Sequence, residues 1–426
     1  MFLPAMRRVM FAWGAIAVLL AAISPVASAQ PSPPASALTS ALNSGMGNIG
    51  GASSAYVVDL NTGQVLYSRA ANVGRLPASV EKLYTTSSAL LRFGPTATLK
   101  TTVFGSGWLD AQGVWHGNLY LKGGGDPTFG SRSFDQTAYG TGATVQRLVS
   151  NLKRSLHLTA VHGWIVGDES YFDSLRGTPA TGFASDLPDV EGELSALAYD
   201  RGFADLEGIV PQARPALDAT QQFAAALRAA HIRLPRTPVV TGRTPATAPR
   251  LAAVPSPPMS TLIQLTNTPS DNYLAEMLLK GLGARFGGTG TTAAGVAVVR
   301  AEVSSQFGIA PQFNDGSGLS RSDHSTPKQV VTLLEHMYSN PDFFNSLAVG
   351  GETGTLQPDM QGTPAQGVCH GKTGTLHDVA ALAGYCHARD GHELVFAFLA
   401  NGLSNPDYVH SVEANQMAVA LAKYDG

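Results

Sequence analysis

The sequence predicts an α+β fold in which helices pack on an antiparallel sheet, with a β-rich segment inserted into that core. Strand-like segments lie near both ends of the chain, and segments with helical periodicity lie between them. Residues 98–250 differ, because short strands alternate there with glycine-rich turns. We therefore expect a core made of residues 30–97 and 251–426. The inserted region, 98–250, would form one or two small subdomains.

The composition argues against a nucleic-acid partner. Only 14% of the 426 residues are charged, and the formal net charge is −3. A nucleic-acid-binding protein needs a basic surface, which this composition does not supply. The 46 glycines and 26 prolines favour turns and short strands.

Residues 1–29 have the pattern of a signal peptide. Arg7 and Arg8 precede the apolar stretch 9–23, and Ala27–Ala29 is a small-residue cleavage pattern. We expect cleavage near Ala29 and an exported protein in the periplasm or cell-wall space. An uncleaved anchor is the alternative, and peripheral membrane association stays open.

The remaining elements follow in order along the core. Residues 30–37, rich in proline, serine and alanine, are expected to form a flexible leader. A β-hairpin is predicted at 55–67, with its turn at Asn61–Gly63. Helices are predicted at 79–92, 259–283, 292–307, 327–339 and 411–423, and strands at 367–375, 380–386 and 393–400.

Two cysteines, Cys369 and Cys386, lie in the predicted C-terminal strands. If His377 and Asp378 form a hairpin turn, the cysteines face each other across antiparallel strands, close enough to bridge. In an exported protein an even cysteine count favours a disulfide. Two separate buried thiols are the alternative.

Three short motifs with a chemical meaning occur in a fixed order. They are Ser79-Val80-Glu81-Lys82, Ser270-Asp271-Asn272 and Lys372-Thr373-Gly374, the set found in penicillin-binding proteins and class A β-lactamases. The first motif is weak alone, because Ser150–Lys153 and Ser325–Lys328 share its spacing. Only Ser79 follows Leu-Pro-Ala at an expected helix start, where serine and lysine three apart share one face.

The chain resembles the D-alanyl-D-alanine carboxypeptidases of the penicillin-binding protein 4 type, the low-molecular-mass class C penicillin-binding proteins. The long gap between Ser79 and Ser270 is typical of that family, whose members carry inserted domains there. The matching segments are Leu76–Leu83, Gly123–Thr128, Asp315–Arg321 and Gly371–Leu376. The resemblance implies a penicillin-binding, β-lactamase-like transpeptidase core.

The resemblance also implies the catalytic roles. Ser79 would attack the peptide carbonyl and form an acyl-enzyme, and Lys82 would take its proton. Ser270 would pass a proton to the leaving amine. Asn272 would hold Lys82 and contact the substrate amide.

The substrate-binding residues follow from the same resemblance. The terminal carboxylate would be bound by the third motif, and the backbone N–H groups of Ser79 and Thr375 would form an oxyanion hole. The expected set is Lys372, Thr373, Gly374, Thr375, Leu376 and Ser317. Asp126 and Arg321 would flank a side pocket for the zwitterionic end of a diaminopimelate side chain. A structural turn aspartate and a surface arginine are the alternatives.

The predicted function is a serine D-alanyl-D-alanine carboxypeptidase acting on peptidoglycan stem peptides and acylated by β-lactams, with DD-endopeptidase activity as an addition. A β-lactamase or esterase with the same site is one alternative, and a catalytically silent cell-wall binding protein is another. No metal or cofactor is expected, because His370, His377, His387 and His392 lack ligand spacing. The sequence sets neither the oligomeric state nor the carboxypeptidase-to-endopeptidase balance.

Overall fold

The computed structural model describes residues 33–426, apart from 51, 187, 206–207, 209 and 237. The predicted signal peptide lies outside the described residues. The predicted leader is corrected, because helix α1 (Pro33–Ile49) begins inside it. Leu38, Leu42 and Met46 of α1 are buried against the main sheet, and this apolar stripe makes a helix more stable than a solvated leader.

The main sheet joins both ends of the chain and confirms the predicted α+β core. Its six strands run in the order β11-β12-β13-β14-β1-β2, with antiparallel neighbours. Their bounds are β1 (Ala52–Asp59), β2 (Val65–Arg69), β11 (Ala348–Val349), β12 (Cys369–Leu376), β13 (Val379–His387) and β14 (Glu393–Asn401).

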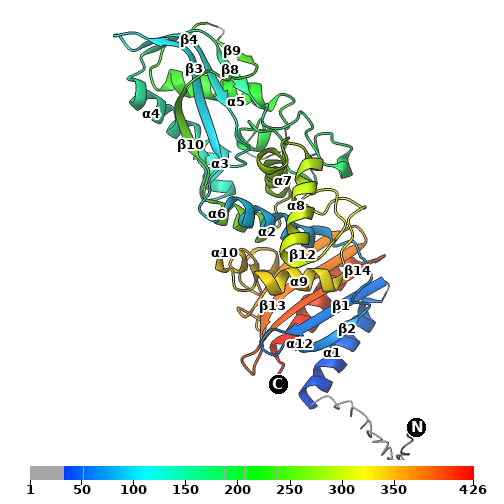
Figure 1. Cartoon of the computed structure of the whole chain (residues 1–426). Helices are drawn as coiled ribbons and strands as arrows, with labels where there is room; N and C mark the ends of the chain where they lie inside the picture. The colour runs from blue at the N-terminus through cyan, green and yellow to red at the C-terminus, as the bar shows by residue number, and fades with distance from the viewer. Residues whose placement is uncertain (1–32, 51, 187, 206–207, 209, 237) are drawn as a thin grey trace, which may run out of the picture.

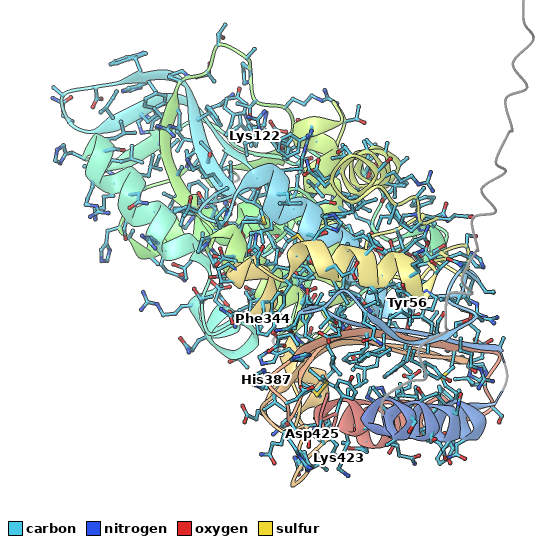
Figure 2. All side chains as sticks on the ribbon, turned by 60° about the horizontal axis from the view of Figure 1, so that its bottom comes forward. Tyr56, Lys122, Phe344, His387, Lys423 and Asp425 are labelled. Atoms are coloured by element: carbon cyan, nitrogen blue, oxygen red, sulfur yellow. A yellow bond between two sulfur atoms is a disulfide. The ribbon has the colours of Figure 1, made fainter. Side chains whose placement is uncertain are left out.

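Helices cover both faces of this sheet, as Figures 1 and 2 show. One face packs on α1 and the C-terminal helices, α11 (Pro406–Val412) and α12 (Val419–Ala422), which are joined by a π-helical turn. The other face packs on the helical layer that carries the site. That layer contains α2 (Lys82–Phe93), α6 (Met259–Asn267), α7 (Asn272–Phe286), α8 (Thr292–Phe307), α9 (Pro327–Met337) and α10 (Pro341–Phe344).

The predicted helix 259–283 is wrong as one piece. Helix α6 ends at Asn267 and α7 begins at Asn272. Between them Ser270 has φ 68, a left-handed conformation that cannot continue a right-handed helix. Residues 266–272 are polar apart from Pro269, so the sequence does mark this break, and the prediction of one helix overlooked it.

A second sheet lies at the other end of the molecule (Figure 1). Its strand order is β10-β3-β4-β8-β9, with β7 also paired to β4. Helices α4 (Val145–Leu156) and α5 (Pro215–Ala229) pack on it around a separate apolar core. The strands are β3 (Lys100–Leu109), β4 (Val114–Lys122), β7 (Ala160–His162), β8 (Ile165–Asp168), β9 (Val239–Thr241) and β10 (Arg250–Pro255). A short pair, β5 (Phe129–Gly130) and β6 (Ala143–Thr144), flanks α3 (Arg132–Ala138).

The predicted disulfide is confirmed. Cys369 of β12 and Cys386 of β13 are paired in register and bonded, with Cα atoms 4.1 Å apart. Leu376 and Val379 are also paired, so residues 377 and 378 form the predicted turn.

Candidate active site

Ser79 lies in a 3₁₀ turn (Ala78–Glu81) that runs directly into α2. The turn is held from behind by Gly318, where an added Cβ would lie 1.9 Å from the carbonyl oxygen of Ala78. Ala78 itself has φ 46, a left-handed value that is unusual for a residue with a side chain. Close packing therefore fixes the turn. Ser79 is half-buried and lines a cavity, which is described below.

Lys82 is fully buried one turn after Ser79. Its Nζ donates hydrogen bonds to Ser79 Oγ at 2.8 Å, to Asn272 Oδ1 at 2.5 Å and to the carbonyl oxygen of Ser317 at 2.8 Å. Burial lowers the pKa of Lys82 to about 7, although neighbouring carboxyl groups oppose the shift. Much of this lysine is therefore neutral near pH 7 and able to accept the Ser79 proton.

Four buried carboxyl groups, those of Glu81, Glu276, Asp315 and Asp323, interact with one another, and the first three also interact with Lys82. Burial is the main cause that raises the pKa of each, to about 8 for Glu276 and about 9 for Asp323. Glu276 Oε1 accepts hydrogen bonds from two backbone N–H groups, at 2.9 and 2.8 Å. The carboxyl groups favour the charged form of Lys82, but burial of the lysine outweighs them and its pKa is lowered.

The second motif stands at the break between α6 and α7. Asp271 caps α7, since its Oδ1 accepts a hydrogen bond of 2.8 Å from the N–H of Leu274. Asn272 then begins the helix with its side chain on Lys82. The hydroxyl of Ser270 makes no hydrogen bond to any other residue that the structure describes.

The third motif lies on β12, close to Ser79. An added Cβ at Gly374 would lie 2.6 Å from the carbonyl oxygen of Pro77 and 3.1 Å from the nitrogen of Ser79. Only glycine lets the strand approach this closely. Lys372 is fully buried, and its Nζ donates to the carbonyl oxygen of Thr373 at 2.9 Å. Burial, and then the charge of Lys82, hold the pKa of Lys372 well below its ordinary value.

A cavity of about 1020 Å³ opens at Ser79. Asn272, Thr375 and Leu376 line it beside the nucleophile, and Arg321 lines it further out. The inserted region supplies much of one wall, through Pro179, Ala180, Phe183, Pro188 and Asp189. This contribution was absent from the sequence prediction, because a long loop carries no periodic pattern.

Asp126 and Arg321 do not meet at this cavity. Arg321 is 55% exposed and forms a two-bond ion pair with Asp378, at 2.5 and 3.0 Å. Asp126 is 2% exposed, and its Oδ1 accepts hydrogen bonds from the N–H and Oγ1 of Thr128, both at 2.8 Å. Asp126 is not among the cavity-lining residues. The structure therefore brings only Arg321 of this pair to the cavity.

Two other predicted residues, Ser317 and Thr373, are buried. Ser317 contributes its carbonyl oxygen to Lys82, while its side chain is buried. Thr373 donates from Oγ1 to Thr355 Oγ1 at 2.7 Å and is 6% exposed. Within the described ranges, no group of three or more His, Cys, Asp or Glu side chains is arranged to hold a metal ion.

The carboxyl groups around Lys82 were missed at the sequence level. Only Glu81 could have been placed near Lys82 from the sequence, because it stands beside Lys82 inside the first motif and follows the apolar Val80. Glu276, Asp315 and Asp323 come from distant segments, so only the folded chain brings them to Lys82.

Comparison with known proteins places the chain in a family. The model of the D-Ala-D-Ala carboxypeptidase 3 (S13) family matches residues 35–207 and 205–424. A D-alanyl-D-alanine carboxypeptidase of Actinomadura sp. is 31% identical, and the match covers 88% of this chain and 82% of that one. A carboxypeptidase of Mycobacterium tuberculosis is 28% identical, covering 89% and 83%.

A solved structure shares the fold. Penicillin-binding protein 4 of Haemophilus influenzae superposes with a TM-score of 0.68 at 19% identity, covering 89% of this chain and 97% of that chain. The same protein has also been solved with a bound β-lactam.

Proposed function

Because the chain belongs to the D-Ala-D-Ala carboxypeptidase 3 (S13) family, we propose that Ser79 is the nucleophile of a serine D-alanyl-D-alanine carboxypeptidase. The observation that carries this proposal is the hydrogen bond of 2.8 Å from fully buried Lys82 to Ser79 Oγ. A nucleophile and a base in hydrogen-bond contact, with the base held by a third group, are the signature of an activated serine.

The reaction begins when Lys82 Nζ, in its neutral form, takes the proton of Ser79 Oγ. The alkoxide attacks the carbonyl carbon of the penultimate D-alanine, and the carbonyl oxygen becomes an oxyanion between the N–H groups of Ser79 and Thr375. The C–N bond then breaks. The departing amine of the last D-alanine receives a proton through Ser270, which recovers one from protonated Lys82. Water hydrolyses the resulting ester and restores Ser79.

The third motif supports the proposed substrate class. Lys372 and Thr373 would attract the terminal carboxylate that a carboxypeptidase substrate carries. Peptidoglycan stem peptides ending in D-Ala-D-Ala have this carboxylate. A β-lactam carries a carboxylate near a strained amide, so it would acylate the same serine and inhibit the enzyme.

DD-endopeptidase activity is a second candidate. The cavity of about 1020 Å³ extends from Ser79 to the inserted region. This volume is at the upper end of the range for small-molecule pockets, about 300–1,000 Å³, which favours a large substrate such as a crosslinked stem peptide. Comparing the hydrolysis of a crosslinked muropeptide dimer with that of a monomeric pentapeptide tests this addition. Hydrolysis of the monomer alone would limit the enzyme to carboxypeptidase activity.

The same function requires an exported protein in the periplasm or cell-wall space. None of the helices in the described part of the chain is both long and apolar enough to span a membrane. We also propose that residues 98–250 are an inserted unit. Its separate apolar core supports this division, although β10 continues its sheet to Pro255.

Covalent labelling tests the nucleophile directly. The exported form of the protein would be incubated with a fluorescent penicillin, and the labelled peptide identified by mass spectrometry. Ser79→Ala should abolish labelling. Ser150→Ala is a matched control, because Ser150 and Lys153 have the same spacing on surface helix α4, and it should label normally. Labelling that survives Ser79→Ala would refute the assignment.

Turnover distinguishes the alternatives. Release of D-alanine from a pentapeptide supports a carboxypeptidase. Rapid hydrolysis of a chromogenic cephalosporin, without D-alanine release, would favour a β-lactamase. Absence of both, together with absence of labelling, would favour a catalytically silent cell-wall binding protein.

A further inference from the structure

Three consecutive residues at the start of α7 are held by the inserted region. Asp271 forms an ion pair with Arg201, in which Nη2 of the arginine donates to Oδ2. Asn272 donates from Nδ2 to the carbonyl oxygen of Asp189 at 2.6 Å. The ring of Tyr273 packs on Gly192, where an added Cβ would lie 2.6 Å from Cδ2. The second motif is therefore fixed from outside its own helix.

Arg201 is confined on several sides. Its guanidinium lies 5.2 Å from the ring centre of Tyr139 and 5.3 Å from that of Tyr273. Its Nε donates to the hydroxyl of Tyr139 at 2.5 Å, and its Nη1 lies 3.5 Å from Glu191 Oε2. The side chain is only 10% exposed. Because a planar guanidinium between two rings has little freedom, the carboxylate of Asp271 is bound at a fixed place.

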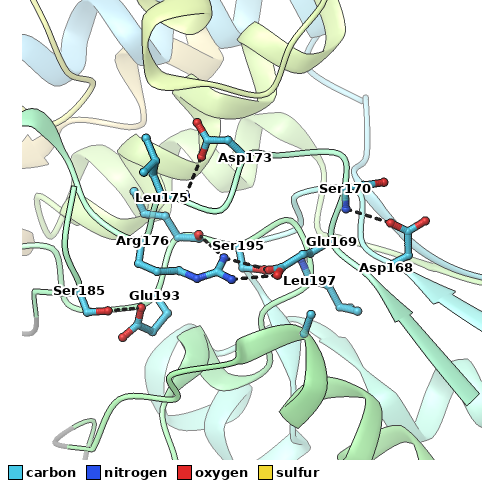
Figure 3. A network of polar contacts seen from close by, with 12 residues as sticks. Asp168, Glu169, Ser170, Asp173, Leu175, Arg176, Ser185, Glu193, Ser195 and Leu197 are labelled. Atoms are coloured by element: carbon cyan, nitrogen blue, oxygen red, sulfur yellow. Dashed lines mark hydrogen bonds and ion pairs between the residues drawn. The ribbon is translucent and has the colours of Figure 1, made fainter. Parts of the chain in front are cut away.

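The segment that carries Arg201 is itself anchored by a polar network (Figure 3). Arg176 donates two hydrogen bonds to Glu169, both at 2.9 Å, and Glu169 also accepts one from Ser195. Ser185 donates to Glu193 at 2.6 Å, and the N–H of Glu193 donates to the carbonyl oxygen of Arg201 at 2.9 Å. These hydrogen bonds hold the loop to which Arg201 is attached.

The backbone of Ser270 explains why the contact between Arg201 and Asp271 is needed. It has φ 68, and a non-glycine residue keeps this strained conformation only where the surroundings impose it. On the core side, the N–H of Ser270 donates to Asn267 at a long 3.3 Å, and that of Asp271 donates to Thr266 at 2.9 Å. Arg201 holds the other side of the turn through Asp271.

We propose that Arg201 is a positioning residue for acylation: by fixing Asp271, it keeps Ser270 and Asn272 in place beside Lys82 and the nucleophile. The inserted region thereby takes part in catalysis without contacting the reacting atoms. This inference rests on the proposed function, because it assumes that Ser79 is acylated with the help of the second motif.

The test compares two variants of the full chain. Arg201→Ala removes the brace on Asp271. Lys280→Met is the matched control, since Lys280 of the same helix α7 forms another ion pair with the inserted region, to Asp173 at 2.6 Å. Acylation by a fluorescent penicillin and the melting temperature would be measured for both.

Arg201→Ala should lower the acylation rate about 10²-fold, the loss that a misplacement of about 1 Å causes. The loss should fall on kcat for a D-Ala-D-Ala peptide more than on KM, because Arg201 does not line the cavity. The Lys280→Met variant should be acylated at nearly the wild-type rate, even where its melting temperature falls as much as that of Arg201→Ala. Equal acylation losses in the two variants would overturn the proposal and assign Arg201 a purely structural role.

Two further measurements separate positioning from misfolding. Added guanidinium, far below denaturing concentrations, should restore acylation to Arg201→Ala and leave Lys280→Met unchanged. Asp271→Asn keeps a good helix cap but loses the charge. It should lower the acylation rate as much as Arg201→Ala does, and the variant with both substitutions should show no further loss of that rate. Additive losses, or no rescue, would contradict the inference, whereas a wild-type protein that no penicillin labels would instead refute the proposed function.

Discussion

The acylation rate of Ser79 should rise with pH about a midpoint near 7. Lys82 can accept the serine proton only as the neutral amine, and burial lowers its pKa to about 7. Burial disfavours the charged form, so the neutral amine accumulates as pH rises through that value. The neutral fraction is about 9% at pH 6 and about 91% at pH 8, which predicts a tenfold increase. At its ordinary pKa, less than about 0.1% of a lysine is neutral at pH 7.

The assay is the second-order rate of acylation by a limiting concentration of a β-lactam, measured from about pH 5.5 to about pH 9. Under these conditions the profile reports groups of the free enzyme. Two histidines supply the controls for this profile. His377 lines the cavity, and His370 stands on β12, where burial lowers its pKa.

His377→Gln and His370→Asn are therefore the controls, and both should keep the midpoint near 7. A flat profile would refute Lys82 as the base, and so would a rise that disappears in either histidine variant. Lys82→Met should be acylated far more slowly at every pH, because it lacks any proton acceptor at this position.

Three other changes test separate parts of the structure. Gly374→Ala should slow penicillin labelling about 10²-fold, because its Cβ would lie 2.6 Å from a backbone carbonyl oxygen. Gly371→Ala on the same strand meets its nearest atom at 3.2 Å and should lose much less; equal losses would argue against the close approach. Replacing Cys369 and Cys386 by alanine should lower the free energy of unfolding by about 3 kcal/mol in urea titrations, given their separation of 17 residues, and an unchanged midpoint would contradict this. Arg321→Ala should reduce the hydrolysis of diaminopimelate-containing peptides more than that of simple D-Ala-D-Ala mimics, whereas an equal reduction would exclude a side-chain pocket at this arginine.

Features with a local signature were predictable from the sequence. The hairpin at the start of the core has a clear turn between two alternating segments, and β1 and β2 pair there as expected. The disulfide followed from the turn position alone, because the period of two along a strand fixes which residues face each other. Ser79, Lys82 and Asn272 were named from motifs, and the structure joins them by hydrogen bonds.

Features that depend on tertiary packing were not predictable. The left-handed backbone of Ser270 is imposed by its surroundings, although Pro269 and the polar residues of 266–272 do mark the break between α6 and α7. The pair of Arg201 with Asp271 joins residues 70 positions apart that share no motif. Asp126 was named from the family resemblance; the structure buries it, and it is not among the cavity-lining residues.

The pairing of β1 with β14 has a consequence for the order in which the protein can form. Asp59 faces Leu394 and Ala52 faces Asn401, so one of the first strands to leave the ribosome waits for one of the last. Until then the first hairpin has an open edge, and such long-range pairing is slow to form. The second sheet, with its own core, can fold during this delay. A chain that ends before β12 would contain Ser79 and Lys82 but would lack the strand that carries the third motif, so the site can form only from a nearly complete chain.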